Sequence, residues 1–278
     1  MTSPGAEFRL WLVKSAQINS NSKRRLGDPL VILFREFASS INLFFRKLVR
    51  RYVKKIIEIA LTGTDVIPTV RAAITSHEFE VRNLSNVPFF KTRRDLFKAC
   101  LDQVKAPDDL HLEFGVYKAD SINMCAKLAP QRSFIGFDSF QGLPEAWTLG
   151  ARKGAFDIGG KLPSVRKNVS LVKGFFDASL PGFCKENQGR TIAFIHIDCD
   201  LYTATRDVLN LLRPMLRPGT VIAFDEYYNY PDWLEHEYKA WMEFVEAAAV
   251  KFAYIGYIRT GNQVALRIDA IGANPPGQ

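Results

Sequence analysis

The sequence of 278 residues has few cysteines and no long apolar stretch. Its cysteines, Cys100, Cys125, Cys184 and Cys199, form no CxxC or CxxH pattern, which argues against a zinc site or a disulfide framework. The longest clean apolar run of the first half covers residues 30–34, whereas a membrane-spanning helix needs about 20 residues. The N-terminus also lacks the basic head and apolar stretch of a signal peptide. We therefore expect a cytoplasmic protein with reduced thiols and no transmembrane helix.

The net charge of +8 comes entirely from the first part of the chain. Residues 1–60 hold twelve Lys or Arg and four Asp or Glu, and residues 61–278 hold 25 of each sign. Because the larger part of the chain is balanced, the basic excess gives no reason to expect a nucleic-acid groove there. We expect no nucleic-acid partner.

Residues 30–60 combine apolar and basic pairs at helical spacing. The apolar pairs Phe44/Phe45, Leu48/Val49, Tyr52/Val53 and Ile56/Ile57 alternate with the basic pairs Arg46/Lys47, Arg50/Arg51 and Lys54/Lys55. A repeat of four is close to the helical period of 3.6, so the pattern predicts an amphipathic helix. We expect it to pack on the protein itself or on a second subunit in a homo-oligomer. The alternative is peripheral contact with an anionic membrane surface.

From about residue 90 the chain alternates between strand and helix patterns. We expect strands at 110–116, 133–137, 169–172, 191–197, 220–224, 251–258 and 263–268, and helices near 118–129, 177–187, 203–213 and 232–250. This order predicts an α/β fold with a Rossmann-like, mostly parallel seven-stranded sheet, helices on both faces and an antiparallel C-terminal hairpin. We divide the chain into a basic helical extension (1–84), the α/β domain (85–270) and a C-terminal tail (271–278).

The turn after the first strand is a candidate ligand site. Glu113 lies inside that strand and Gly115 follows it, where a glycine lets the backbone approach a ligand closely. One glycine is not the GxGxxG fingerprint of dinucleotide binding, and a tight turn without any ligand is the simpler alternative. Asp138 follows the second strand, 23 residues beyond Gly115. That spacing is close to the offset of about 20 residues at which an acidic residue reaches a ribose diol.

Carboxylates also follow the fourth and fifth strands. Asp198 and Asp200 follow one, and Asp225 and Glu226 follow the other. Parallel strands bring their carboxyl ends to one edge of the sheet, where these groups would repel one another. A hard divalent cation such as Mg²⁺ would relieve that repulsion. The alternative is that some of them cap the following helices, Asp200 first among them.

The motifs together resemble the macrocin O-methyltransferase family of class I S-adenosylmethionine-dependent methyltransferases. The resemblance extends over roughly residues 85–268 and excludes residues 1–80. The matching stretches are LEFGVYKADSI (112–122), FIGFDSFQGLPE (134–145), VKGFFDASLP (172–181), FIHIDCDLYTATRDVLNLLRPMLRPGTVIAFDEYYNYP (194–231) and HEYKAWMEF (236–244).

The resemblance implies a role for each matching position. Glu113 and Gly115 would line the methionine end of S-adenosyl-L-methionine, and Asp138 would hold its ribose. Further cofactor-binding positions would be Val116, Tyr117, Ser121, Ser139, Gly174 and Phe175. Asp198, Asp225 and Glu226 would hold Mg²⁺ or another divalent cation.

Two positions depart from the family pattern. Ala119 and Asp120 stand where many relatives have glycine, which leaves the backbone route after the first turn open. Glu226 stands where relatives often have a second Asp, so its carboxylate would bind the cation directly, through water, or not at all.

The implied reaction is methyl transfer from a sulfonium to a hydroxyl of a sugar or a glycosylated natural product. Asp198, Asp200 and His236 are the candidate general bases. We expect the substrate to meet the loop at 141–165 and the aromatic segment at 227–233. Two alternatives remain at this point: an NAD-dependent oxidoreductase that also uses Asp138, and a non-catalytic, methyltransferase-like interaction protein.

Overall fold

The computed structural model of the chain describes residues 67–106, 109–148 and 150–273. The amphipathic helix expected at residues 30–60 lies outside these ranges, so its docking, the homo-oligomer and the membrane contact stay predictions, as do the domain boundaries. No helix within the described ranges is long and apolar enough to cross a bilayer.

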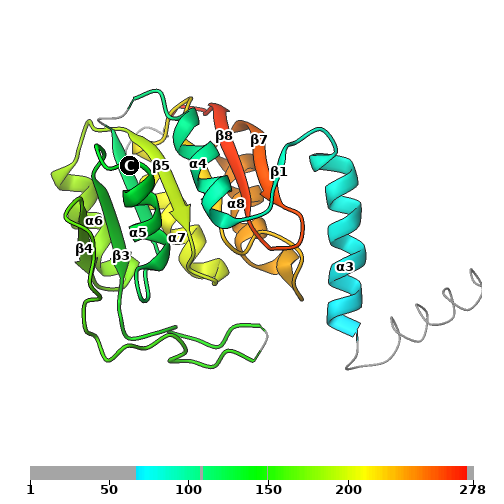
Figure 1. The fold of residues 1–278 in the computed structure, drawn as a ribbon, viewed down its shortest axis with the longest axis horizontal. Helices are drawn as coiled ribbons and strands as arrows, with labels where there is room; N and C mark the ends of the chain where they lie inside the picture. Colours follow the sequence, from blue (N-terminus) through cyan, green and yellow to red (C-terminus); the bar gives the residue numbers. More distant parts are fainter. Residues whose placement is uncertain (1–66, 107–108, 149, 274–278) are drawn as a thin grey trace, which may run out of the picture. The chain divides into compact units, whose positions relative to one another are not determined.

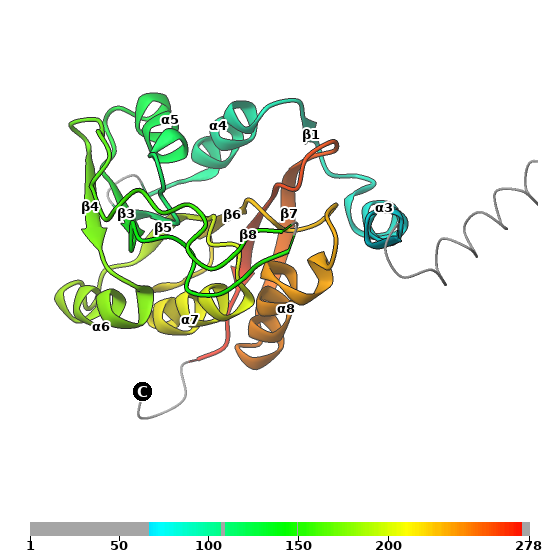
Figure 2. The ribbon, with the colours of Figure 1, turned by 90° about the horizontal axis from the view of Figure 1, so that it is seen from below.

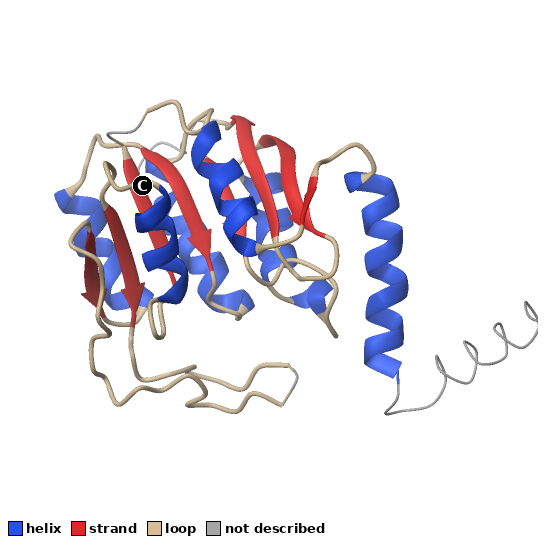
Figure 3. Cartoon of the chain, in the orientation of Figure 1, coloured by secondary structure: helices blue, strands red, loops and turns tan. Residues whose placement is uncertain are grey.

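One eight-stranded sheet runs through the described part of the chain, in the order β1-β7-β8-β6-β5-β2-β3-β4 (Figures 1 and 3). Its strands are β1 (Phe89–Phe90), β2 (Leu110–Phe114), β3 (Phe134–Asp138), β4 (Val169–Lys173), β5 (Ile192–Ile197), β6 (Val221–Phe224), β7 (Lys251–Ile258) and β8 (Val264–Ala270). All neighbours are parallel except β8, which is antiparallel to both β6 and β7. The Rossmann-like fold with its C-terminal hairpin is therefore confirmed. The additional strand is β1, whose two residues are too few to give a sequence pattern.

Helices cover both faces of this sheet. Figure 2 shows α4 (Arg93–Gln103) and α5 (Asp120–Leu128) on one face, and α6 (Phe176–Glu186), α7 (Tyr202–Leu212) and α8 (Glu237–Ala247) on the other. Short 3₁₀ turns at Arg213–Met215 and Trp233–Glu235 follow α7 and precede α8. The turn at Trp233–Glu235 explains why the helix expected from 232 begins only at Glu237.

Two helices that precede β2 were not predicted by residue range, although the first lies within the helical extension expected at 1–84. These are α3 (Ile67–Phe79), continued by a π-helical turn at Glu80–Leu84, and α4. Helix α4 begins after Thr92, whose hydroxyl accepts the backbone N–H of Asp95 at 3.1 Å. This side-chain cap satisfies one of the free N–H groups of the first turn and fixes where the helix starts.

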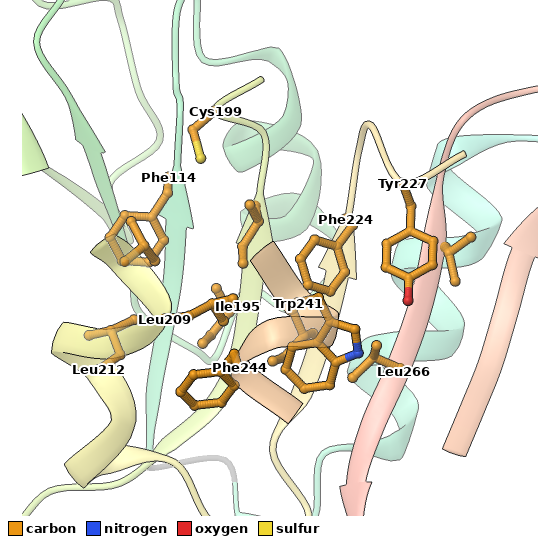
Figure 4. Packing of buried hydrophobic residues seen from close by; sticks show 14 of the residues in the cluster. Phe114, Ile195, Cys199, Leu209, Leu212, Phe224, Tyr227, Trp241, Phe244 and Leu266 are labelled. Atoms are coloured by element: carbon orange, nitrogen blue, oxygen red, sulfur yellow. The ribbon is translucent and has the colours of Figure 1, made fainter. Parts of the chain in front are cut away.

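The core forms between the sheet and its helices because both faces of the central strands are apolar. All six residues of β5 are buried. In Figure 4, Ile195 of β5 lies near Leu209 of α7, and Phe224 of β6 lies near Trp241 of α8. The buried positions of α7 are spaced three or four residues apart, as expected for one face of a helix, and are Thr205, Val208, Leu209 and Leu212. This packing holds the strand ends in fixed positions.

The buried histidine His111 should make stability fall in mild acid. Its ring lies beside Phe134 at 5.2 Å and is 1% exposed; burial and the charge of Arg132 lower its pKa to about 4. The unfolded chain, with a pKa near 6.5, therefore binds the proton more readily between these two values. The contribution of neutral His111 to the free energy of unfolding is complete above pH 6.5 and is lost as the pH falls toward 4.

Urea unfolding at pH 7 and pH 4.5 tests this expectation. The wild type should lose unfolding free energy between pH 7 and pH 4.5, and we expect His111→Phe to reduce that loss by on the order of 2 kcal/mol. The matched control is His77→Gln, which replaces an exposed histidine of α3 and should leave the loss of unfolding free energy as in the wild type. An unchanged pH dependence in His111→Phe would show that other groups cause the loss.

Candidate active site

A pocket of about 610 Å³ opens at the edge where β2, β3, β5 and β6 end. In Figure 1 the long loop between β3 and β4 lies along the same edge. The switch point of the sheet lies here, between β2 and β5. Eleven residues selected from the sequence line this pocket, namely Gly115, Val116, Tyr117, Ser121, Asp138, Ser139, Phe175, Asp198, Asp200, Asp225 and Glu226. The structure thus brings together most of the predicted site.

Three selected residues do not line the pocket: Glu113, Gly174 and His236. Glu113 is buried directly beneath it and accepts a hydrogen bond from the lining residue Ser121 at 2.9 Å. His236 packs behind the lining, on Tyr230 and on the lining residue Trp147, with ring centroids 6.1 and 6.2 Å apart. Its position makes His236 the weakest of the three base candidates.

The turn after β2 requires glycine at position 115. Gly115 has φ +88°, and a Cβ there would lie 1.6 Å from the backbone oxygen of Asp198. The two strand ends therefore meet backbone to backbone. Ala119, one of the departures from the family pattern, also adopts a left-handed conformation with φ +68°. The chain thus follows a glycine-like route at this turn without a second glycine.

Asp138 holds this turn in place from β3. Its Oδ2 accepts the backbone N–H groups of Val116 and Tyr117, each at 2.8 Å. Its Oδ1 accepts the N–H of Phe140 at 2.6 Å. The carboxylate therefore orders two neighbouring loops of the pocket, a role that spacing alone did not reveal.

A buried histidine lies between two of the acidic groups. His196 of β5 contacts Glu113 Oε2 through Nδ1 at 2.9 Å and Asp225 Oδ1 through Nε2 at 3.4 Å. Burial lowers its pKa, but the hydrogen bonds with Asp225 and Glu113 outweigh burial and raise the pKa to about 10. Sequence reasoning missed His196, although a histidine inside the apolar strand at 191–197 was a visible signal.

Asp225 also receives donors from distant parts of the chain. Arg93 of α4 forms an ion pair with its Oδ2, and Gln263 Nε2 donates to the same oxygen at 3.2 Å. Burial raises the pKa of Asp225, but the hydrogen bond and charge of His196 and the charge of Arg93 together lower it. Arg93 precedes every predicted strand, so no strand-end pattern pointed to it.

The other acids of the pocket form a compact group. Asp198, Asp200 and Glu226 each place one carboxylate oxygen within 4.8 Å of the others. Burial, followed by the charges of neighbouring acids, raises the pKa of all three, that of Asp200 to about 7. Glu226 Oε2 is buried without a hydrogen-bond partner. Behind them Glu237, also missed from the sequence, is fully buried and accepts the N–H of Glu226 at 3.1 Å.

The aromatic segment expected to meet the substrate belongs mostly to the core. Tyr227, Tyr228, Tyr230 and Trp233 are each at most 3% exposed, and none of them lines the pocket. Trp233 Nε1 donates to Thr75 Oγ1 of α3 at 3.0 Å. The expectation was wrong for these residues because they are buried, and Phe79 of α3 packs on three of them, namely Tyr227, Tyr228 and Trp233. The loop at 141–165, which was also expected to meet the substrate, does reach the pocket. Its residues Gly142, Leu143, Pro144, Trp147 and Phe156 line it.

The fold and the pocket agree with the methyltransferase architecture expected from the sequence motifs, and comparison with known proteins points the same way. Residues 112–227 match a family model described as a methyltransferase domain. The resemblance to O-methyltransferases seen in the sequence motifs is thereby confirmed.

Two proteins similar to this chain have names that state a more specific activity. The chain is 33% identical over 165 residues to the 8-demethyl-8-(2,3-dimethoxy-alpha-L-rhamnosyl)-tetracenomycin-C 4'-O-methyltransferase of Streptomyces olivaceus, a match that spans 49% of this chain and 60% of that protein. The crystal structure of a calicheamicin methyltransferase superposes with a TM-score of 0.52 at 24% identity, over 78% of this chain and 91% of the other. The second similarity concerns the fold.

Proposed function

We propose that the protein is an S-adenosyl-L-methionine-dependent O-methyltransferase that methylates a sugar hydroxyl of a glycosylated natural product. The observation that carries the proposal is one pocket bounded on one side by the Gly115 turn with Asp138, and on the other by the group of Asp198, Asp200 and Glu226. The first side suits a nucleoside-containing cofactor and the second suits a hydroxylated acceptor. The name of the Streptomyces olivaceus relative, a methyltransferase of a rhamnosyl tetracenomycin, supports the choice of acceptor class.

The cofactor side is formed by backbone groups and two carboxylates. The bare backbone at Gly115 allows close approach. Asp138 keeps the turn ordered through both lone pairs of Oδ2, and the remaining lone pair of Oδ1 can accept a ribose hydroxyl. Glu113 lies beneath Ser121, and its negative charge would attract the amino group at the methionine end of the cofactor. We assign the flanking contacts to Val116, Tyr117, Ser121, Ser139, Gly174 and Phe175. When bound, the sulfonium supplies an electrophilic methyl group, and the protein's task is to align the acceptor with it.

The acidic group fits a divalent cation such as Mg²⁺. The unpartnered Oε2 of Glu226 and the raised pKa values of Asp198 and Asp200 are what a cation would relieve. Asp198, Asp225 and Glu226 stay our proposed ligands. Asp198 belongs to this group and also to a neighbouring cluster with His196 and Asp225, and Asp200 is a close neighbour. Binding through Asp225 would compete with the ion pair from Arg93. A bound cation would supply charge that orients neighbouring hydroxyls and lowers the pKa of the acceptor hydroxyl.

Asp200 is our proposed general base. It lines the pocket, is 7% exposed, and has φ +62°, an uncommon conformation for a residue other than glycine. Such conformations are kept mainly where the surrounding structure or a function requires them. Asp198 remains the second candidate, and the position of His236 on Tyr230 makes it the third.

The acceptor would meet an aromatic wall at the mouth of the pocket. Phe156 is 45% exposed and packs edge-on against Tyr117, with ring centroids 5.5 Å apart. Trp147 is half-buried on the same loop. Exposed aromatic faces beside carboxylates suit a sugar, whose C–H groups and hydroxyls need both kinds of contact.

A methyl-transfer assay tests the proposal and its dependence on a cation. Protein, S-adenosyl-L-methionine and a panel of rhamnosyl glycosides and nucleotide sugars are incubated, and mass spectrometry scores addition of a methyl group. We expect a methylated glycoside, loss of product after exhaustive chelation, and recovery when Mg²⁺ is restored. Calorimetry with S-adenosylhomocysteine on the chelated protein is the control for intact folding. Full turnover without a cation would show that the acidic group is structural, and no product across the panel would count against the acceptor class.

A further inference from the structure

We propose that His196 is a positioning residue that joins the two halves of the active site. One nitrogen of its buried ring holds the carboxylate of Glu113 on the cofactor side, and the other holds the carboxylate of Asp225 on the acceptor side. The inference rests on the proposed function, because it takes Glu113 and Asp225 to serve the cofactor and the cation. It adds a residue that touches neither ligand.

The three side chains form a row across the centre of the sheet. Strand β5 lies between β2 and β6. Glu113 of β2 stands opposite His196 in the parallel register, and His196 stands opposite Ala223 of β6. Asp225 follows the last residue of β6, and its backbone N–H donates to Ile197 O of β5 at 2.9 Å, which extends the pairing of the two strands by one residue. The topology, and not a local turn, thus places the ring between the two carboxylates.

The row is closed off from water and continues at both ends. His196 is fully buried, and Glu113 and Asp225 are each 2% exposed. Ser121 donates to the other oxygen of Glu113, and Arg93 and Gln263 donate to the other oxygen of Asp225. Each carboxylate therefore has one set of partners of its own and shares only His196 with the other.

The ring itself is held in one orientation. Phe97 of α4 packs against it edge-on, with centroids 4.8 Å apart and planes at 73°. Rotating the ring would break contacts with both carboxylates at once, since one nitrogen serves each. Buried carboxylates that lose a partner are costly and move to find another. Removing the ring nitrogens should thus misplace both groups, whereas removing an outer partner should disturb only one.

Separate binding measurements distinguish these cases. His196→Phe keeps an aromatic ring next to Phe97 but removes both nitrogens. Ser121→Ala removes a partner of Glu113 together with the cofactor contact assigned to Ser121, so both changes fall on the cofactor side. Gln263→Leu removes only a partner of Asp225. Affinity for S-adenosylhomocysteine is measured by calorimetry without a cation, and affinity for Mn²⁺ by electron paramagnetic resonance without cofactor.

We expect His196→Phe to weaken both affinities by about 10-fold or more, the usual scale for losing a partner behind a ligand-binding group. Ser121→Ala should weaken cofactor binding alone, and Gln263→Leu should weaken Mn²⁺ binding alone. A folded His196→Phe protein that keeps either affinity would overturn the proposal. Wild-type protein that binds neither ligand would overturn the proposed function itself, an outcome seen before any variant is made.

A second measurement on the wild type covers the case in which His196→Phe does not fold. The chain has only four histidines, so ¹⁵N-histidine labelling gives a simple ring spectrum. His196→Gln, which keeps one donor, assigns the signals. We expect the Nδ1 signal of His196 to shift when S-adenosylhomocysteine is added alone, and the Nε2 signal to shift when Mg²⁺ is added alone. Signals that respond to only one ligand, or to neither, would contradict the proposal.

Discussion

Gly115→Ala is expected to abolish binding of S-adenosylhomocysteine and to destabilise the fold. The added Cβ would lie 1.6 Å from the backbone oxygen of Asp198 and 2.6 Å from its carbonyl carbon. Both obstacles are backbone atoms of the neighbouring strand end, so no side chain can move aside. The positive φ of Gly115 adds strain of its own. We expect a loss of about 3 kcal/mol or more of unfolding free energy.

Gly189→Ala is the matched control for this substitution. Gly189 has φ +84°, nearly the value at Gly115, but a Cβ there would have no atom within 4 Å. It therefore carries the conformational strain without the collision. Urea unfolding and calorimetry of both variants separate the two effects. If Gly115→Ala matched Gly189→Ala in both measurements, the strand ends at the switch point would not be as close as the structure has them.

Asp200→Asn is expected to reduce turnover by about 10²–10⁴-fold, the contribution usual for a general base. The amide has nearly the same shape as the carboxylate but cannot accept the hydroxyl proton. Because Asp200 lies on the acidic side of the pocket and makes none of the contacts of the Gly115 turn, affinity for S-adenosylhomocysteine should not change. Single-turnover kinetics with a methylated glycoside as readout measures the chemical step.

Asp207→Asn controls for loss of charge in the pocket. Asp207 also lines the pocket, but its side chain is 39% exposed and pairs with Arg206 on the surface. We expect near wild-type turnover from this variant. Equal losses in the two variants would indicate a general electrostatic effect, and full turnover in Asp200→Asn would move the base role to Asp198.

The sequence was sufficient for those parts of the site that depend on strand order. Alternating strands and helices place Gly115, Asp138, Asp198 and Asp225 at strand ends, and parallel strands bring such ends to one edge. No contact between particular side chains was needed for that inference. The same reasoning could not show that Asp138 ties two loops together, because its partners are backbone N–H groups whose direction depends on the turn.

The residues that were missed depend on long-range packing. Arg93 reaches Asp225 across 132 positions of sequence. His196 meets both carboxylates only because of the register of β5 with its two neighbours. The segment at 227–233 has the composition of a substrate surface, yet α3 buries most of its aromatic residues. Periodicity within one segment does not specify which segment will cover it.

Titration of S-adenosylhomocysteine and of NADH into the purified protein tests the central claim most directly. The account predicts saturable, one-to-one binding of S-adenosylhomocysteine at the pocket beside Gly115 and Asp138, and no binding of NADH. Binding of NADH would instead favour the alternative that the protein is an NAD-dependent oxidoreductase. Absence of heat from S-adenosylhomocysteine, in protein shown to be folded by circular dichroism, would contradict the account outright.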